Sequence, residues 1–263
     1  MFIIGQLAIL TSVFIKKLIE RKSTRTLYRQ IIKETIKKTK VQEKVFLKNI
    51  ENLTFENLRL LTQNRIEYYQ LEIIKEVGYQ KFYSSFFSGL ENIPRLFNRA
   101  KKLKAFIRSW EILNQIEFIR NQGYEKITFM GDKYNQHDLE RSKVLKEFRR
   151  YTDSLALKVN GKHFDPLTHQ YLDSLFTTIG LWQQTMDRRP HIVNRKLIVP
   201  IRILNRKHQN LNWSSEINDL LIEASYRYEN MSHVLKTGRR QYSIYVASSR
   251  YFHRTLALIK ENL

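Results

Sequence analysis

The sequence predicts a mostly α-helical protein: a helical bundle with a basic β-hairpin in its C-terminal third and a helical N-terminal extension. Long segments place apolar residues three to four positions apart, which is the period of an α-helix packed on one side. Eight glycines and four prolines are few for the many tight turns of a β-sandwich. Hydrophobic residues make up 42% of the 263 positions, which is enough for a sizeable core.

The first fifteen residues form an uncharged, apolar segment. As a helix it is about 22 Å long, too short to cross a bilayer. It lacks the basic start and cleavage pattern of a secretory signal, and no arginine precedes Arg21, unlike in a transit peptide. Two interpretations stay open, a terminal helix buried against a partner and a membrane anchor, and burial against a partner is favoured.

A long cationic helix is predicted to follow, from Lys16 to about Gln42. Ile31, Ile32 and Ile36 belong to its intermittent apolar stripe, while lysine and arginine fill the other faces. Further helices are predicted in the middle of the chain, where a glycine just after the last apolar position is a common helix stop. The first covers about residues 55–77 and ends before Gly78, and the second begins at Pro94 and ends at about Gly123. The third covers residues 136–160 and ends at the turn signal Asn160-Gly161.

Two segments between these helices differ in character. Tyr79–Leu90 is rich in aromatic residues, which could stack on nucleic-acid bases or, as their spacing favours, pack in a core or interface. Tyr124–Met130 has the pattern of a short β-strand. We place a domain boundary close to this strand, which gives a helical N-terminal extension over 1–135 and a second domain over 136–263.

The composition excludes several classes of functional site. With no cysteine, the chain cannot hold a disulfide scaffold, a Cys-ligated metal centre or a catalytic thiol. Its glycines are all isolated from one another, so the sequence contains neither the glycine-rich fingerprint of dinucleotide-binding proteins nor a P-loop. The motifs of zinc proteases, α/β-hydrolases and kinases are missing too. We therefore expect a protein that is not an enzyme and has no cofactor.

A metal site is geometrically possible near one predicted helix start. Asp165-Pro166 has the pattern of an N-cap followed by a proline in the first turn. His169 and Asp173 are four residues apart on the helix that follows, and His163 is close by. A surface hydrogen bond is the favoured interpretation of such a His–Asp pair, so we predict no metal ion here.

The positive charge is concentrated at the two ends of the chain. The net charge is +21, and residues 1–50 carry 12 basic and 3 acidic residues, whereas residues 51–187 carry 20 and 17. Residues 188–254 carry 13 basic and 4 acidic residues. Such a surplus repels itself unless a polyanion neutralises it. Nucleic acid is the commonest such partner and an anionic membrane is the alternative.

The C-terminal third holds the element that we expect to bind nucleic acid. Asp187-Arg188-Arg189-Pro190 interrupts the helical pattern, and two β-rich runs then flank Asn194-Arg195-Lys196. This pattern predicts a hairpin near 191–203 with Arg195 and Lys196 at its tip. A hairpin can lie in a groove with its tip cations on phosphates, or it can be an ordinary hairpin with solvated charges. One helix with Trp213 and a last, basic helix are predicted to follow.

This order of elements resembles the seventh small-subunit ribosomal protein family over about residues 140–263. The residues that carry the resemblance are Arg189-Pro190, Arg195-Lys196, Val199-Pro200-Ile201, the helix segment Leu221–Arg227 and His253-Arg254. The hairpin lacks the family's glycines, and Ile259 stands where the family's C-terminal tail has an asparagine.

The resemblance implies a structural protein of a small ribosomal subunit. Such a protein binds small-subunit ribosomal RNA, organises the subunit head, and contacts neighbouring ribosomal proteins close to messenger RNA and exit-site tRNA. The added segment 1–135 is similar to those of mitochondrial members. A composition rich in Ile, Lys, Asn, Phe and Tyr, without a presequence, suits a chain encoded in an organelle genome and located in the mitochondrial matrix. By position, the implied RNA contacts are Arg188, Arg189, Arg195, Lys196, Arg202, Arg206, Lys207, Arg239, Arg240 and Arg254.

The alternative function is a basic accessory subunit of a mitochondrial inner-membrane complex. In that case residues 1–15 would insert into the membrane and the cationic helix after them would meet anionic lipid.

Overall fold

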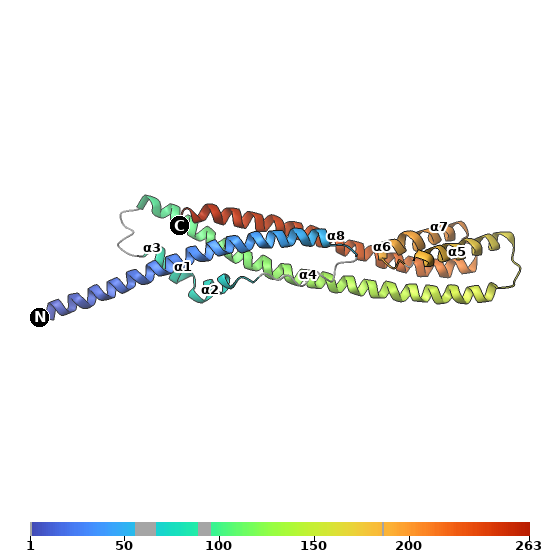
Figure 1. Cartoon of the computed structure of the whole chain (residues 1–263), viewed down its shortest axis with the longest axis horizontal. Coiled ribbons are helices and arrows are strands. Elements are labelled where there is room, and N and C mark those ends of the chain that lie inside the picture. Colours follow the sequence, from blue (N-terminus) through green and yellow to red (C-terminus); the bar gives the residue numbers. More distant parts are fainter. Residues whose placement is uncertain (1, 56–66, 89–95, 186) are drawn as a thin grey trace. The chain divides into compact units, whose positions relative to one another are not determined.

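The computed structural model describes residues 2–55, 67–88, 96–185 and 187–263, and every element in these ranges is a helix (Figure 1). The mostly α-helical class is thereby confirmed. The long helices are α1 (Phe2–Asn52), α4 (Leu96–Val159) and α8 (Asn212–Lys260). The shorter elements are α2 (Tyr69–Val77), α3 (Tyr79–Phe87), α5 (Pro166–Thr185), α6 (Pro190–Val193), the π-helical turn η3 (Asn194–Ile198) and α7 (Val199–Lys207).

The chain divides into two compact units, and α1, α4 and α8 each contribute residues to both. Unit 1 comprises Met1–Asn49, Gln63–Glu125 and Tyr242–Leu263, and unit 2 comprises Ile50–Thr62 and Lys126–Gln241. Each unit has a hydrophobic core of its own. The predicted boundary at residue 135 falls within α4, and it stays a prediction.

Aromatic side chains from α1, α3 and α4 form the centre of unit 1. Tyr28, Phe82 and Phe106 are fully buried, and the ring of Tyr28 lies 4.9 Å from that of Phe82 and 5.1 Å from that of Phe106. The Tyr28 hydroxyl shares a 2.8 Å hydrogen bond with Ser109 Oγ, so its polar atom is satisfied inside the core. Core packing, the favoured interpretation of the aromatic segment, is confirmed for the described part of Tyr79–Leu90.

Gly78 separates α2 from α3. Its φ of 78° is a left-handed conformation that glycine adopts without the strain that a Cβ would add. Its N–H donates to the carbonyl of Ile74 at 2.9 Å and closes the last turn of α2. The predicted helix stop at Gly78 is confirmed. Residues 56–66 of the predicted helix and the predicted start at Pro94 lie outside the described residues.

The strand predicted over Tyr124–Met130 is wrong, because α4 continues through it. The flanking glycines suggested turns, but both are helical, and Gly123 is a packing position instead. The ring of Tyr245 on α8 packs against the α4 backbone at Gly123, where a Cβ would lie 3.2 Å from Cε2 of that ring.

We expect Gly123→Ala to destabilise the folded chain relative to Gly131→Ala by about 1–3 kcal/mol, because the added methyl group would require the Tyr245 ring, which is buried and packed against Phe46, to shift by a few tenths of an ångström. Both substitutions gain the same helix propensity, and a Cβ at Gly131 meets nothing within 4 Å. Denaturant unfolding of the two variants measures the difference. Equal stabilities would contradict a rigidly held Tyr245 ring at Gly123.

The predicted β-hairpin near 191–203 is also wrong, because this segment forms α6, η3 and α7. Its buried residues Val193, Leu197 and Ile201 are spaced four apart, which is the period of a helix rather than of a strand. β-Branched residues favour strands only weakly, and packing in the core of unit 2 outweighs that preference.

A proline explains why the helix widens into a π-turn between α6 and α7. Pro200 has no N–H, and in a regular α-helix its ring would clash with the carbonyl of Lys196, four residues earlier. In η3 the N–H of Val199 instead donates to the carbonyl of Asn194, five residues earlier. The wider turn accommodates the proline without ending the helical path.

Candidate nucleic-acid interface

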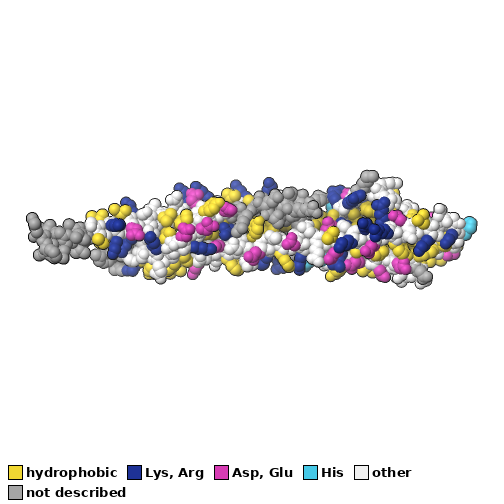
Figure 2. Space-filling model, turned by 90° about the horizontal axis from the view of Figure 1, so that it is seen from below, with side chains coloured by type: hydrophobic (Ala, Val, Ile, Leu, Met, Phe, Trp, Pro, Cys, Tyr) yellow, Lys and Arg dark blue, Asp and Glu magenta, His cyan; other side chains and the backbone are white. Residues whose placement is uncertain are grey.

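Seven of the ten predicted RNA-contacting cations lie between residues 188 and 207 of unit 2, just before α6 and along η3 and α7. We call this set the α6–α7 basic surface: Arg188, Arg189, Arg195, Lys196, Arg202, Arg206 and Lys207. No aspartate or glutamate occurs between residues 188 and 215. On the face of the molecule in Figure 2, acidic side chains lie among the lysines and arginines. The α6–α7 basic surface has no acidic residue within its own stretch of sequence.

Buried neighbours fix the direction of the cations at the π-turn. Leu197 and Ile198 are 1% and 0% exposed, so they anchor η3 in the core of unit 2. Arg195 and Lys196, on the preceding positions, are exposed. Neither they nor the equally exposed Arg206 and Lys207 of α7 have an ion-pair or hydrogen-bond partner within the part of the chain that the structure describes. These cations are free to meet an external anion.

Arg202 is the half-buried member of the surface. Its Nη1 donates a 3.0 Å hydrogen bond to Oγ of Ser225 on α8, 23 residues away in the sequence. This contact holds the guanidinium in place, and sequence reasoning missed it because the two residues meet only once α7 packs on α8.

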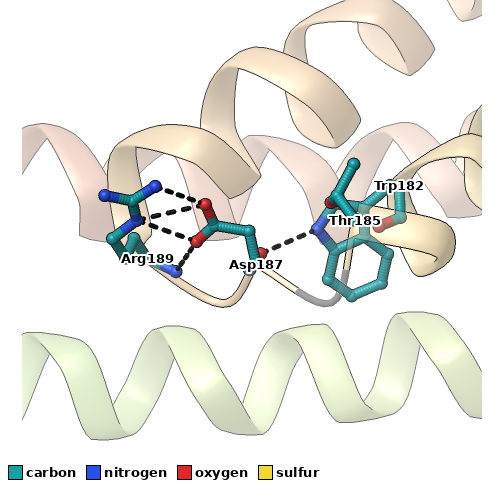
Figure 3. Close-up of polar contacts among 4 residues, drawn as sticks. All are labelled: Trp182, Thr185, Asp187 and Arg189. Carbon is teal, nitrogen blue, oxygen red and sulfur yellow. Dashed lines mark hydrogen bonds and ion pairs between the residues drawn. The ribbon is translucent and has the colours of Figure 1, made fainter.

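Asp187 already neutralises Arg189 at the corner between α5 and α6 (Figure 3). Arg189 Nε lies 3.0 and 3.1 Å from the two carboxylate oxygens, and Nη2 lies 2.6 Å from Oδ2. The backbone N–H of Arg189 donates to Oδ1 at 3.0 Å, and Trp182 Nε1 donates to the Asp187 carbonyl at 3.3 Å. The hydrogen bonds from Arg189 lower the pKa of Asp187 to about 2, so the carboxylate stays ionised near neutral pH.

We expect Asp187→Asn to tighten RNA binding by about three- to tenfold, because it releases the guanidinium of Arg189 to contact a phosphate. The asparagine Oδ1 can still accept from the backbone N–H of Arg189, so the corner is preserved. The control is Asp173→Asn on α5, which removes the same charge from an exposed site away from Arg189. Filter binding to ribosomal RNA compares the variants. Equal effects would mean that Arg189 does not contact RNA.

A small polar pocket adjoins the end of α7. Its volume is about 190 Å³, and its lining consists of Asn205, Arg206, Gln209, Ser214, Ser215 and Asn218. Asn205 is 3% exposed, and its Oδ1 accepts a 3.0 Å hydrogen bond from the Tyr171 hydroxyl. Its Nδ2 has no partner within the described residues. Amide, hydroxyl and guanidinium groups beside exposed cations can hydrogen-bond to a phosphate or to the edge of a base.

The remaining predicted contacts lie on α8, apart from the α6–α7 segment in the sequence. Arg239 and Arg240 belong to unit 2 and are exposed, and Nη2 of Arg239 donates to the carbonyl of Leu53 at 2.8 Å. Arg254 is exposed as well but belongs to unit 1. Seven of the ten predicted residues thus lie within residues 188–207, and the other three lie on α8.

The possible metal ligands near the start of α5 have other roles. Oδ1 of Asp165 accepts hydrogen bonds from the N–H groups of Leu167 and Thr168, each 3.1 Å long, which confirms the predicted cap. The hydrogen bonds from Thr168 also lower the pKa of Asp165. His169 and Asp173 lie 3.7 Å apart with side chains 66% and 70% exposed, as in a surface pair. In the ranges that the structure describes, no three His, Asp or Glu side chains gather to hold a metal ion.

Comparison with known proteins identifies no relatives: no family model, no curated protein and no solved structure matches the chain. Among the described residues, no helix has an apolar stretch long enough to span a bilayer. The first fifteen residues are expected to pack against a partner or, in the alternative, to anchor the chain in a membrane, and the side chains of residues 1–10 lie outside the described ones. At the end of this segment, Val13, Phe14 and Ile15 are 45–54% exposed.

Proposed function

We propose that this chain is a structural RNA-binding protein that contacts the phosphates of small-subunit ribosomal RNA through the α6–α7 basic surface. The observation that carries the proposal is an acid-free segment with seven cations, of which Arg195, Lys196, Arg206 and Lys207 are exposed and unpartnered within the described residues. Each phosphate that such a cation neutralises releases condensed counterions, which favours binding to a polynucleotide. The protein catalyses no reaction of its own.

The ribosomal and mitochondrial part of the proposal is supported by the sequence resemblance. The motifs Arg195-Lys196 and Val199-Pro200-Ile201 lie on the α6–α7 segment, and Leu221–Arg227 lies on α8 as a helix. The predicted hairpin is no longer part of this support. We place the protein in the head of a mitochondrial small subunit, in contact with ribosomal RNA and neighbouring ribosomal proteins.

The test is a salt titration of the purified full-length chain with small-subunit ribosomal RNA. Four to six phosphate contacts at the α6–α7 basic surface alone predict that the logarithm of the binding constant falls with the logarithm of the salt concentration with a slope at least as steep as about −3 to −5. A slope near zero, or no binding at low salt, would contradict the proposal. In mitochondria, carbonate extraction separates the alternative, because an anchored membrane subunit stays in the pellet whereas a ribosomal protein leaves with the RNA.

A further inference from the structure

One face of α1 in unit 1 carries a continuous row of cations. We call it the α1 stripe: Lys22, Arg29, Lys33, Lys37, Lys40, Lys44 and Lys48. All of them are exposed. Successive members are three, four or seven residues apart, so at about 100° per residue they fall within one sector of about 100°. With a rise of 1.5 Å per residue, the α1 stripe is about 39 Å long.

The opposite side of α1 is occupied by the core of unit 1. Tyr28, Ile31, Ile32 and Phe46 are 0–9% exposed and lie on the face turned away from the α1 stripe. Tyr28, Ile31 and Ile32 belong to the core cluster, and the ring of Phe46 lies 5.6 Å from that of Tyr245. The packing therefore fixes which side of α1 faces solvent, and that side is the cationic one.

The carboxylates of α1 leave most of the α1 stripe without a counter-charge. Glu43 binds Arg250 and His253 of α8, with N–O distances of 2.7 Å to each, so it is engaged away from the stripe. Glu34 pairs with Lys37 at 2.9 Å, at the edge of the stripe. Arg29 donates from Nε to the carbonyl oxygen of Leu263 at 3.2 Å. Among the described residues, no ion-pair or hydrogen-bond partner is found for the side-chain ammonium groups of the five others, Lys22, Lys33, Lys40, Lys44 and Lys48.

We infer that the α1 stripe is a second RNA-binding surface, which lies along the phosphate backbone of a ribosomal RNA helix. A row of seven exposed cations about 39 Å long, five of them without a side-chain partner within the described residues, complements the regular line of phosphates on a nucleic-acid helix. A membrane fits less well, since an interfacial helix inserts its apolar face into lipid, and that face of α1 is already buried in unit 1. This inference rests on the proposed function for the identity of the RNA, but it concerns different residues in the other unit.

The experiment replaces Lys22, Lys33, Lys40, Lys44 and Lys48 with glutamine in the full-length chain. These side chains are exposed and unpartnered within the described residues, so the fold is expected to persist, which circular dichroism checks. If each lysine contacts one phosphate, the salt slope for small-subunit ribosomal RNA becomes about 3.5–4.5 less steep, and the affinity near physiological salt falls by about a hundredfold or more.

A matched control removes five positive charges from elsewhere in unit 1. It carries glutamine at exposed positions off the α1 stripe, namely Lys16, Lys17, Lys101, Lys104 and Lys260. Its net charge equals that of the stripe variant. We expect a change of less than about threefold in affinity and of less than about one in the salt slope, because only contacts, and not net charge alone, set the slope.

The outcomes separate this inference from the proposed function. Loss of RNA affinity in the stripe variant but not in the control supports the α1 stripe. Equal behaviour of the two variants overturns the inference, while the proposed function survives if the parent chain binds RNA with a steep slope. Failure of the parent to bind RNA overturns both. If the stripe variant binds RNA as the parent does but no longer binds vesicles of equal parts phosphatidylcholine and phosphatidylserine, the inference is overturned and the α1 stripe is a membrane-binding surface instead.

Discussion

Replacing Arg195 and Lys196 with glutamate is expected to weaken the binding of the chain to small-subunit ribosomal RNA by at least about a hundredfold. Each cation contributes a charge-assisted hydrogen bond worth about 1.5–3 kcal/mol, and each glutamate would in addition repel the phosphate it faces. The two side chains are exposed and unpartnered within the described residues, so the fold of unit 2 should be retained. Filter binding at fixed salt measures the affinity, and circular dichroism checks the helix content.

The matched control reverses Lys143 and Lys146, which are exposed on the part of α4 that belongs to unit 2. This control changes the net charge by the same amount at positions outside the α6–α7 basic surface. We expect it to lose far less affinity than the double variant at the π-turn. If the two variants bind equally well, the affinity depends on overall charge and the α6–α7 basic surface is not the interface.

Phe106→Ala is expected to lower the free energy of unfolding by about 3–5 kcal/mol. Phe106 is fully buried in unit 1, and its ring lies 5.1 Å from Tyr28, 5.5 Å from Tyr79 and 5.6 Å from Phe86. Truncation removes the transfer free energy of the ring and leaves a cavity among side chains from three helices. Denaturant unfolding followed by tryptophan fluorescence measures the loss, because Trp110 packs against the same core cluster.

Phe118→Ala provides the comparison on the same helix. Phe118 is 65% exposed, so its truncation should change the unfolding free energy by no more than about 0.5 kcal/mol. Similar losses in the two variants would contradict the core that we describe for unit 1.

Local signals in the sequence were sufficient to predict several features of the fold. The cap at Asp165 and the stop at Gly78 follow from the chemistry of single residues, and both are observed. The turn predicted at Asn160-Gly161 is observed too, with Gly161 at a φ of 72°. Each of these depends on a hydrogen bond or a dihedral angle within a few residues, so no tertiary contact is needed to predict it.

Features that depend on tertiary packing could not be predicted in this way. The valines and isoleucines of residues 191–203 are compatible with either a strand or a buried helix. Only the burial of Val193, Leu197 and Ile201 on one side shows that the segment is helical. Gly123 lies inside α4 and packs against Tyr245, a residue distant in the sequence, so its role could not be predicted from its neighbours along the chain.

The candidate interface also combines features that the sequence predicts with features that only the fold shows. The charge of the α6–α7 segment was evident from the sequence, whereas the hydrogen bond between Arg202 and Ser225 required the fold. The α1 stripe, by contrast, was present in the sequence as a spacing of three, four and seven residues. It became interpretable as a surface only when the core showed which side of α1 is buried.

Ultraviolet crosslinking of the native particle tests the central claim most directly. If the α6–α7 basic surface lies on ribosomal RNA, peptides from residues 188–210 should carry crosslinked nucleotides, and the chain should co-sediment with the small ribosomal subunit. Native material that contains no RNA, and that remains with lipid-embedded subunits after carbonate extraction, would contradict the account.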